Sequence, residues 1–212
     1  GRFLACAVPK VDLGELQKLR DALGAAQDRA LAQLVGDMIL SARIYQPFVT
    51  GQGLSVYAAN LERENLMKRT FVARYREAER RDGKRPHVMF KFGGTHMMRG
   101  LSSTHVPTLA TFVGDFALHE GVGAFNVMVL CGPGTKSGDL MGNAGPCEFD
   151  LATAFPDLVA HVDAMQPTLF DLRGWKDKPR RWEHLSAEAR ELIWAYDALL
   201  FVPNGKPAVF LK

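Results

Sequence analysis

The organisation of the chain is decided by a short stretch near its middle, PHVMFKFGGTH, which covers residues 86–96. The first seven of these residues, 86–92, have the length and the largely apolar composition of a β-strand. A Gly-Gly-Thr step at 93–95 follows at once and leads to His96. In an open α/β sheet, ligands gather beyond the carboxyl ends of the strands. The sequence therefore predicts a strand over 86–92, with His96 at the mouth of a cleft.

Helical patterns dominate the residues before this stretch. Apolar residues recur at intervals of three, four or seven over 12–45, and Gln46-Pro47 ends the pattern. A second helix is predicted over 58–81, and Gly83 stops it. Beyond His96 the two kinds of pattern alternate: helices are predicted at 105–119, 155–165 and 186–194, and strands at 124–130, 167–172, 197–202 and 208–211.

Strands that alternate with helices are typical of an α/β domain. We therefore expect a largely parallel central sheet flanked by helices, with a helical N-terminal segment. No linker divides the sequence, so a single domain is predicted over 1–212, with the helical segment at 1–85 and the sheet-forming part at 86–212. The first residue is Gly1 and not methionine, so we expect the chain to be the C-terminal part of a longer protein.

The composition argues against several classes of protein and of partner. Apolar residues make up 47% and charged residues 23%, which is ordinary for a globular protein and unlike a disordered one. The 26 basic and 23 acidic residues leave a net charge of +3, too small to favour nucleic acid as a partner. No run of 18 apolar residues indicates a membrane span. The three cysteines, an odd number without metal-ligand spacing, favour buried thiols in a cytoplasmic protein.

Glu64 is the first candidate for chemistry. It falls on the inward-facing line of the helix predicted over 58–81, one turn before Met67, where an unpaired carboxylate would be costly. One interpretation is that Glu64 pairs with His96 and forms an acid–base pair. The other is an ion pair with Arg63 or Lys68 on a solvated face of the helix.

His96 and its neighbours are the second candidate. An imidazole at a cleft mouth can exchange protons near neutral pH, and Arg99, three residues later, can hold an anion or a developing oxyanion. Gly93 and Gly94 would permit a positive φ and a close approach of the backbone to a ligand. The alternative interpretation of His96 is that it caps a helix or binds a carbonyl group.

Other motifs point less clearly to chemistry. The segment 132–148 holds five glycines and two prolines, but its lysine, Lys136, lacks the spacing of a phosphate-binding loop. We interpret this segment as a rim or lid beside the cleft. The stretch 175–182 alternates tryptophan with basic residues, which is typical of an exposed connection. The remaining histidines lack zinc-ligand spacing, so neither a metal nor another cofactor is expected.

Two short motifs resemble those of a known family. Arg63-Glu64-Asn65-Leu66-Met67, followed by a charged turn and an apolar stretch that ends in Gly-x-x-His, is similar to the erythromycin esterase family. Members carry an Arg-Glu-x-x-Met stretch before a strand that ends in His-Asn-x-His. The Gly-x-x-His version is also similar to the haem-binding ChaN-like lipoproteins of the same broad fold group. The segment 196–203 resembles the closing Phe-Asp strand of the family.

The resemblance implies an esterase-type hydrolase that acts on a small molecule, with His96 as a general acid or base assisted by Glu64. Two features depart from the family pattern: Gly93 and Gly94 replace the first histidine and the asparagine, and the glutamate and histidine of the family's N-terminal half have no counterpart in this chain. The alternative is a non-catalytic small-ligand domain of the same fold, with haem as a candidate ligand. The predicted substrate-binding residues are Arg63, Arg99, Gly93, Gly94 and Thr95.

Overall fold

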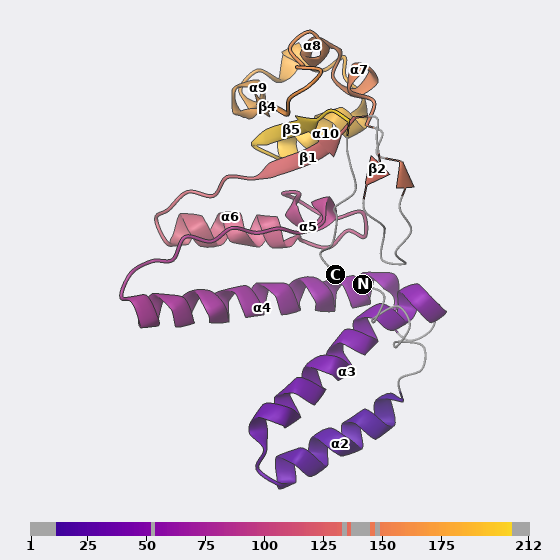
Figure 1. The fold of residues 1–212 in the computed structure, drawn as a ribbon, viewed down its shortest axis with the longest axis vertical. Coiled ribbons are helices and arrows are strands. Elements are labelled where there is room, and N and C mark those ends of the chain that lie inside the picture. Colours follow the sequence, from indigo (N-terminus) through magenta and orange to yellow (C-terminus); the bar gives the residue numbers. More distant parts are fainter. Residues whose placement is uncertain (1–11, 52–53, 133–134, 137–144, 147–148, 205–212) are drawn as a thin grey trace.

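The computed structural model describes residues 12–51, 54–132, 135–136, 145–146 and 149–204. Figure 1 shows long helices at one end of the molecule and a small sheet with short helices at the other. None of the helices in these described ranges has an apolar stretch sufficient to cross a bilayer.

Three helices form the N-terminal part: α2 (Leu13–Ala25), α3 (Arg29–Thr50) and α4 (Val56–Asp82). The single helix predicted over 12–45 is thus two helices, because Gln27 adopts a left-handed conformation with φ of 62° between them. The side chain of Asp28 then caps α3 by accepting a hydrogen bond from the N–H of Leu31. The expected stop at Gln46-Pro47 is wrong, since Pro47 lies inside α3 and the helix runs on to the left-handed Gly51.

The stretch 86–92 is not a strand, which corrects the central expectation from the sequence. It runs as extended chain from the end of α4 to α5 (Gly94–Met97) without a ladder partner in the described residues. A strand exists only where a neighbour accepts and donates its backbone hydrogen bonds. Its apolar side chains are accordingly left open: Met89 is 90% exposed and Val88 47%.

The sheet has three strands in the order β1 (Val127–Cys131), β5 (Ala198–Val202) and β4 (Thr168–Asp171). β1 is parallel to β5, with Met128 opposite Leu199, whereas β4 is antiparallel to β5, with Phe170 opposite Leu199. The α/β character is therefore confirmed, but the sheet is small and mixed and not largely parallel. β2 (Thr135–Lys136) and β3 (Gly145–Pro146) form a separate antiparallel pair. The segment 208–211 lies outside the described residues.

One face of the sheet carries the main core. It is covered by the short helices α7 (Leu151–Ala154), α8 (Pro156–Val159), α9 (Arg173–Lys176) and the 3₁₀ turn η2 (Pro179–Arg181), and by α10 (Ala187–Ala195). Side chains from both layers meet there: Leu130, Phe155, Leu172, Ile193, Leu199 and Phe201. On the opposite face Val129 and Leu169 are each 59% exposed, as the two-residue period of a strand requires.

A second packing centre joins α4 to α6 (Leu109–His119), which begins later than predicted, after its cap Thr108. Phe71 and Tyr75 of α4 meet Phe112 and Phe116 of α6 edge to face, with ring centroids 5.0–6.4 Å apart. Edge-to-face contacts of this kind are favourable beyond the area that they bury. α4 is thus held against α6, and α6 in turn adjoins α5.

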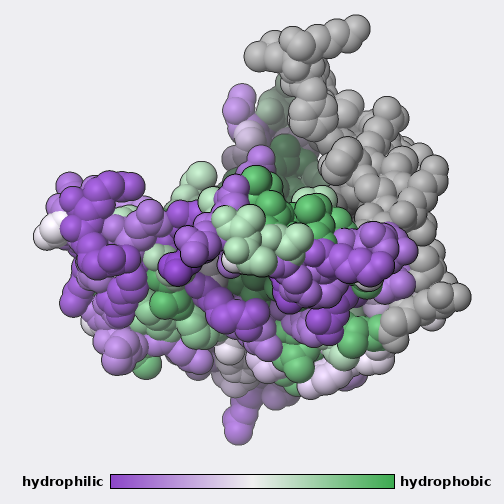
Figure 2. All heavy atoms as spheres, turned by 90° about the horizontal axis from the view of Figure 1, so that it is seen from below, coloured by the Kyte–Doolittle hydropathy of each residue, from purple (hydrophilic) through white to green (hydrophobic). Residues whose placement is uncertain are grey.

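The α2–α3 end of the molecule carries an exposed apolar line. On α3 it includes Leu31, Leu34 and Met38, each about half exposed. Seen from this end in Figure 2, hydrophobic residues gather near the centre with hydrophilic residues to either side. This part of the molecule contributes little to the main core.

Candidate functional site

Glu64 and His96 meet in the interior. Glu64 lies on α4 with no exposed surface, and His96 lies in α5 with 9% of its surface exposed. The Nδ1 atom of His96 is 2.5 Å from Oε1 of Glu64. Glu64 lies on the same inward face of α4 as the buried Asn60 and Tyr75. This helical phase points the carboxylate toward His96.

Backbone contacts position α5 and therefore the imidazole. The N–H of His96 binds the carbonyl of Gly93, and the hydroxyl of Tyr196 donates to the carbonyl of Gly94 at 2.7 Å. Burial, together with the charge of Glu191, raises the pKa of Tyr196 to about 12, so the hydroxyl keeps its proton and remains a donor.

The two glycines have a different role from the one expected. Gly93 has φ of −62°, and neither glycine adopts a positive φ. A Cβ on Gly93 would meet open space, whereas one on Gly94 would lie 3.0 Å from Cε of Met128. The close approach predicted for this step is real at Gly94, but it is made to Met128 and Tyr196 of the sheet part.

The geometry of the pair fixes what it can do chemically. In the tautomer with hydrogen on Nδ1, His96 donates to Oε1 of Glu64, and Nε2 then carries the lone pair that can take up a proton. The other carboxylate oxygen of Glu64, Oε2, is buried without a hydrogen-bond partner in the described residues. Buried unpaired acceptors are uncommon in folded proteins, and Oε2 of Glu62 is a second one among the described residues.

The predicted substrate-binding residues are dispersed. Arg63 stacks over the ring of Tyr45 at 5.3 Å, and Thr95 is exposed on α5. Arg99 donates from both terminal nitrogens to Asp197, at 2.6 Å each. The structure thus brings Glu64 and His96 together and engages both arginines elsewhere.

Sequence reasoning missed a polar network beside α5. Asp197 also accepts a hydrogen bond from the N–H of Asn126 at 2.8 Å, and the side chain of Asn126 donates to the carbonyls of Met97 and Ala195. Burial alone would raise the pKa of the Asp197 carboxyl, but the bonds from Arg99 and Asn126 hold it below its ordinary value. The sequence did carry a signal for this network: Asn126 and Asp197 each stand directly before an apolar strand, β1 and β5.

Two hollows in the described part of the chain are lined by neither Glu64 nor His96. One, of about 400 Å³, lies at the C-terminal end of α4, and the other, of about 720 Å³, lies between α2 and α3. The described ranges contain no group of three His, Cys, Asp or Glu side chains placed to hold a metal ion. Most of the glycine-rich segment 132–148, predicted as a rim or lid, lies outside the described residues.

Cys131 is disulfide-bonded, so the expected free, buried thiol is wrong for this residue. Disulfides persist mainly in oxidising compartments. The disulfide weakens the argument that led from the cysteine count to a cytoplasmic location. That location stays a prediction.

Comparisons with known proteins give one clear match, in structure. No family model matches the sequence, and no curated protein matches it. Among solved structures, a mutant of the erythromycin esterase EreC in its open conformation is similar with a TM-score of 0.56 and 12% sequence identity. The match covers 97% of this chain and 57% of that protein, so the chain spans little more than half of the esterase's length. The chain therefore shares its fold with part of an erythromycin esterase.

Proposed function

We propose that this chain is the C-terminal portion of an esterase-type hydrolase in which His96 acts as the general acid and base. The single observation that carries the proposal is the 2.5 Å contact between Nδ1 of His96 and the fully buried carboxylate of Glu64. The fold shared with part of an erythromycin esterase suggests the reaction class by analogy, because a fold alone does not fix a function.

In the proposed reaction, Glu64 holds the imidazole in the tautomer with hydrogen on Nδ1. Nε2 of His96 accepts a proton from water as the water oxygen bonds to the ester carbonyl carbon. When the bond from that carbon to the leaving oxygen breaks, Nε2–H returns the proton to the departing alkoxide. The products are a carboxylic acid and an alcohol, and His96 is restored. Glu64 is a positioning residue in this scheme.

Residues from a preceding segment complete the site in this proposal. Three observations support it: the chain spans 57% of the similar esterase, Oε2 of Glu64 is unpartnered in the described residues, and the apolar stretch 86–92 pairs with no described strand. A strand and a hydrogen-bond donor supplied from that segment would satisfy both of the open features.

The test is hydrolysis of an aryl ester by the longest natural form of the protein that contains these residues. The variant is His96→Asn, because the asparagine amide can still donate to Glu64 while Nε2 is lost. We expect kcat to fall by about 10²- to 10⁴-fold, the usual contribution of a general acid or base. Far-UV circular dichroism checks that the variant remains folded.

His161→Ala is the matched control, because His161 is an exposed histidine outside the candidate site. Its rate should equal that of the unchanged protein. Glu64→Gln should lower kcat less than His96→Asn does. It should also alter the pH profile of the rate, whereas the profile would not change if Glu64 had only a structural role. Equal rates for His96→Asn and the unchanged protein would remove His96 from the mechanism.

A further inference from the structure

A hollow of about 400 Å³ lies where α4 ends and the extended chain begins. Its base is formed by aromatic and aliphatic side chains from both segments: Phe71, Tyr75, Ala78, Pro86 and Val88. Neither Glu64 nor His96 lines this hollow, and His96 lies at the far end of the extended stretch. The hollow is therefore separate from the candidate hydrolytic site.

The rim of the hollow has an excess of positive charge. Two of its cations are already paired within α4, Arg74 with Glu77 at 2.8 Å and Arg81 with Asp82 at 2.7 Å. Lys84 and Arg85 form no ion pair with a carboxylate of the described residues. The rim therefore carries Lys84 and Arg85 outside any ion pair of the described residues, although the charge of Arg85 also acts on the carboxylate of Glu120.

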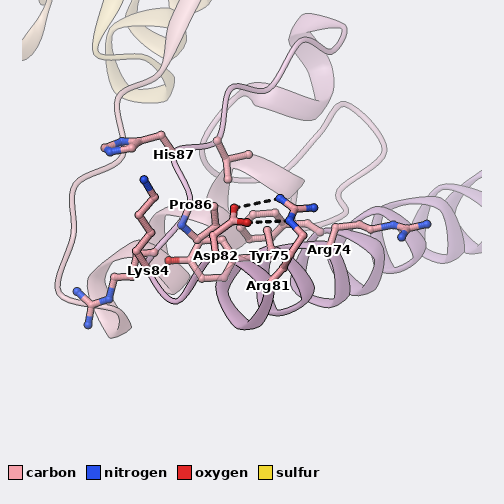
Figure 3. Close-up of a pocket in the computed structure, with 11 residues that line it drawn as sticks. Arg74, Tyr75, Arg81, Asp82, Lys84, Pro86 and His87 are labelled. Carbon is pink, nitrogen blue, oxygen red and sulfur yellow. Dashed lines mark hydrogen bonds and ion pairs between the residues drawn. The ribbon is translucent and has the colours of Figure 1, made fainter.

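Lys84 and His87 lie on the same side of the hollow. Figure 3 shows the ammonium group of Lys84 below the imidazole of His87 in this view, and the paired Arg81 and Asp82 to the other side. A cationic side chain beside an imidazole offers hydrogen-bond donors and a charge that favour an anion.

We propose that this hollow binds a small organic anion, a phosphate or carboxylate group carried on an aromatic ring. The ring lies against Phe71 and Tyr75, where edge and face contacts between aromatic groups are favourable. The anionic group lies between Lys84 and His87. The volume of about 400 Å³ lies in the range of small-molecule sites, and the lining combines an apolar base with a rim of charged and titratable side chains.

The test follows the methyl signals of Ala78 and Val88 by NMR as the longest natural form of the protein that contains these residues is titrated with four probes. Phenyl phosphate and benzoate carry both required features, inorganic phosphate lacks the ring, and benzyl alcohol lacks the charge. We expect the two aryl anions to shift both signals in a saturable way, and the other two probes to bind more weakly. The relative affinities of phenyl phosphate and benzoate identify the preferred anionic group. The signal of Ala189, buried in the other core, should not move.

Lys84→Ala should weaken binding of the tighter aryl anion by about three- to fivefold, as expected for one partly solvated charge contact. Lys178→Ala is the matched control, since Lys178 is an exposed lysine outside the hollow and its loss changes the net charge equally. The control should bind as the unchanged chain does. The proposal is overturned if neither aryl anion binds, if inorganic phosphate or benzyl alcohol binds as tightly as both, or if the two lysine variants weaken binding equally. Because Glu64 and His96 are outside the hollow, none of these outcomes bears on the hydrolytic proposal.

Discussion

At the scale of single residues, the carboxylate of Asp197 joins three partners from distant parts of the sequence. Its carboxylate accepts hydrogen bonds from Arg99, from the backbone of Asn126 and from Lys176, and it is 6% exposed. The lowered pKa of its carboxyl means that the folded state favours the ionised form. That part of the stability is fully present above the pKa of an unfolded aspartate, near 4, and is lost as the pH falls toward the folded value.

Asp197→Asn should therefore lower the free energy of unfolding at pH 7 by about 2 kcal/mol, because charge-assisted bonds to a partly solvated group are lost. The variant should also lose less stability than the unchanged protein between pH 5 and pH 3. Urea unfolding at pH 7 measures the first effect, and urea unfolding at pH 5 and pH 3 measures the second. Asp171→Asn is the control, since Asp171 pairs with Arg173 on the surface and its effect at pH 7 should be much smaller. Equal effects of the two variants would contradict the role assigned to Asp197.

The sequence was informative about residues where local pattern sets position. The helical phase of α4 predicted that Glu64 faces inward. The cleft mouth predicted at His96 stays a prediction, since the stretch before it is not a strand and neither hollow described above is lined by His96. The partner of Arg99 could not be predicted, because Asp197 lies 98 residues away and reaches Arg99 only through the packing of the whole domain.

At the scale of elements, the ends of α4 and α5 show two different uses of glycine. Gly83 ends α4 in the left-handed region with φ of 64°, and its N–H binds the carbonyl of Glu79. Gly93 precedes α5 with φ of −62°. A left-handed position disfavours any residue with a Cβ, whereas the conformation of Gly93 suits every residue.

Gly83→Ala should thus destabilise the protein by about 1 kcal/mol, and Gly93→Ala should leave its stability unchanged or slightly raised. Thermal or urea unfolding of both variants makes the comparison, and each serves as the control for the other. A larger loss for Gly93→Ala would show that the step before His96 needs its glycine for a reason other than backbone conformation.

Element types were largely predictable and pairing was not. Periodicity identified α4, α6, α10, β1, β4 and β5 within a few residues of their bounds. The stretch 86–92 has the composition of a strand, but composition does not supply a neighbour, and in the described residues it stays unpaired. Pro47 was expected to stop α3, yet a proline near the C-terminal end of a helix removes one hydrogen bond without forcing an end there.

At the scale of the whole molecule, the chain has two packing centres and one outlying helix. The sheet core and the aromatic cluster of α4 and α6 meet through α5 and the network around Asn126. The sheet is mixed because β4 runs antiparallel to β5. The path of the connection 160–167 sets this direction, and the residues of β4 themselves do not indicate it. α2 has no buried residue and packs mainly on α3.

Hydrogen exchange should consequently be uneven across the molecule. Amide protons of α2 should exchange by local opening, at rates insensitive to Asp197→Asn, because few buried contacts hold this helix. Amide protons of β5, the central strand, should exchange only with global unfolding and should therefore exchange faster in that variant. Mass spectrometry of peptides covering 13–25 and 198–202 separates the two cases. Equal protection in both peptides would contradict this division.

The bond from Tyr196 to the carbonyl of Gly94 spans 102 positions of sequence. A ribosome adding 5–20 residues per second therefore exposes Glu64 and His96 about 5–20 s before it exposes the hydroxyl that anchors α5. During that interval the nascent chain carries both members of the pair without the contact that fixes their mutual position. The candidate site is accordingly assembled only after the segment that carries Tyr196 has left the exit tunnel.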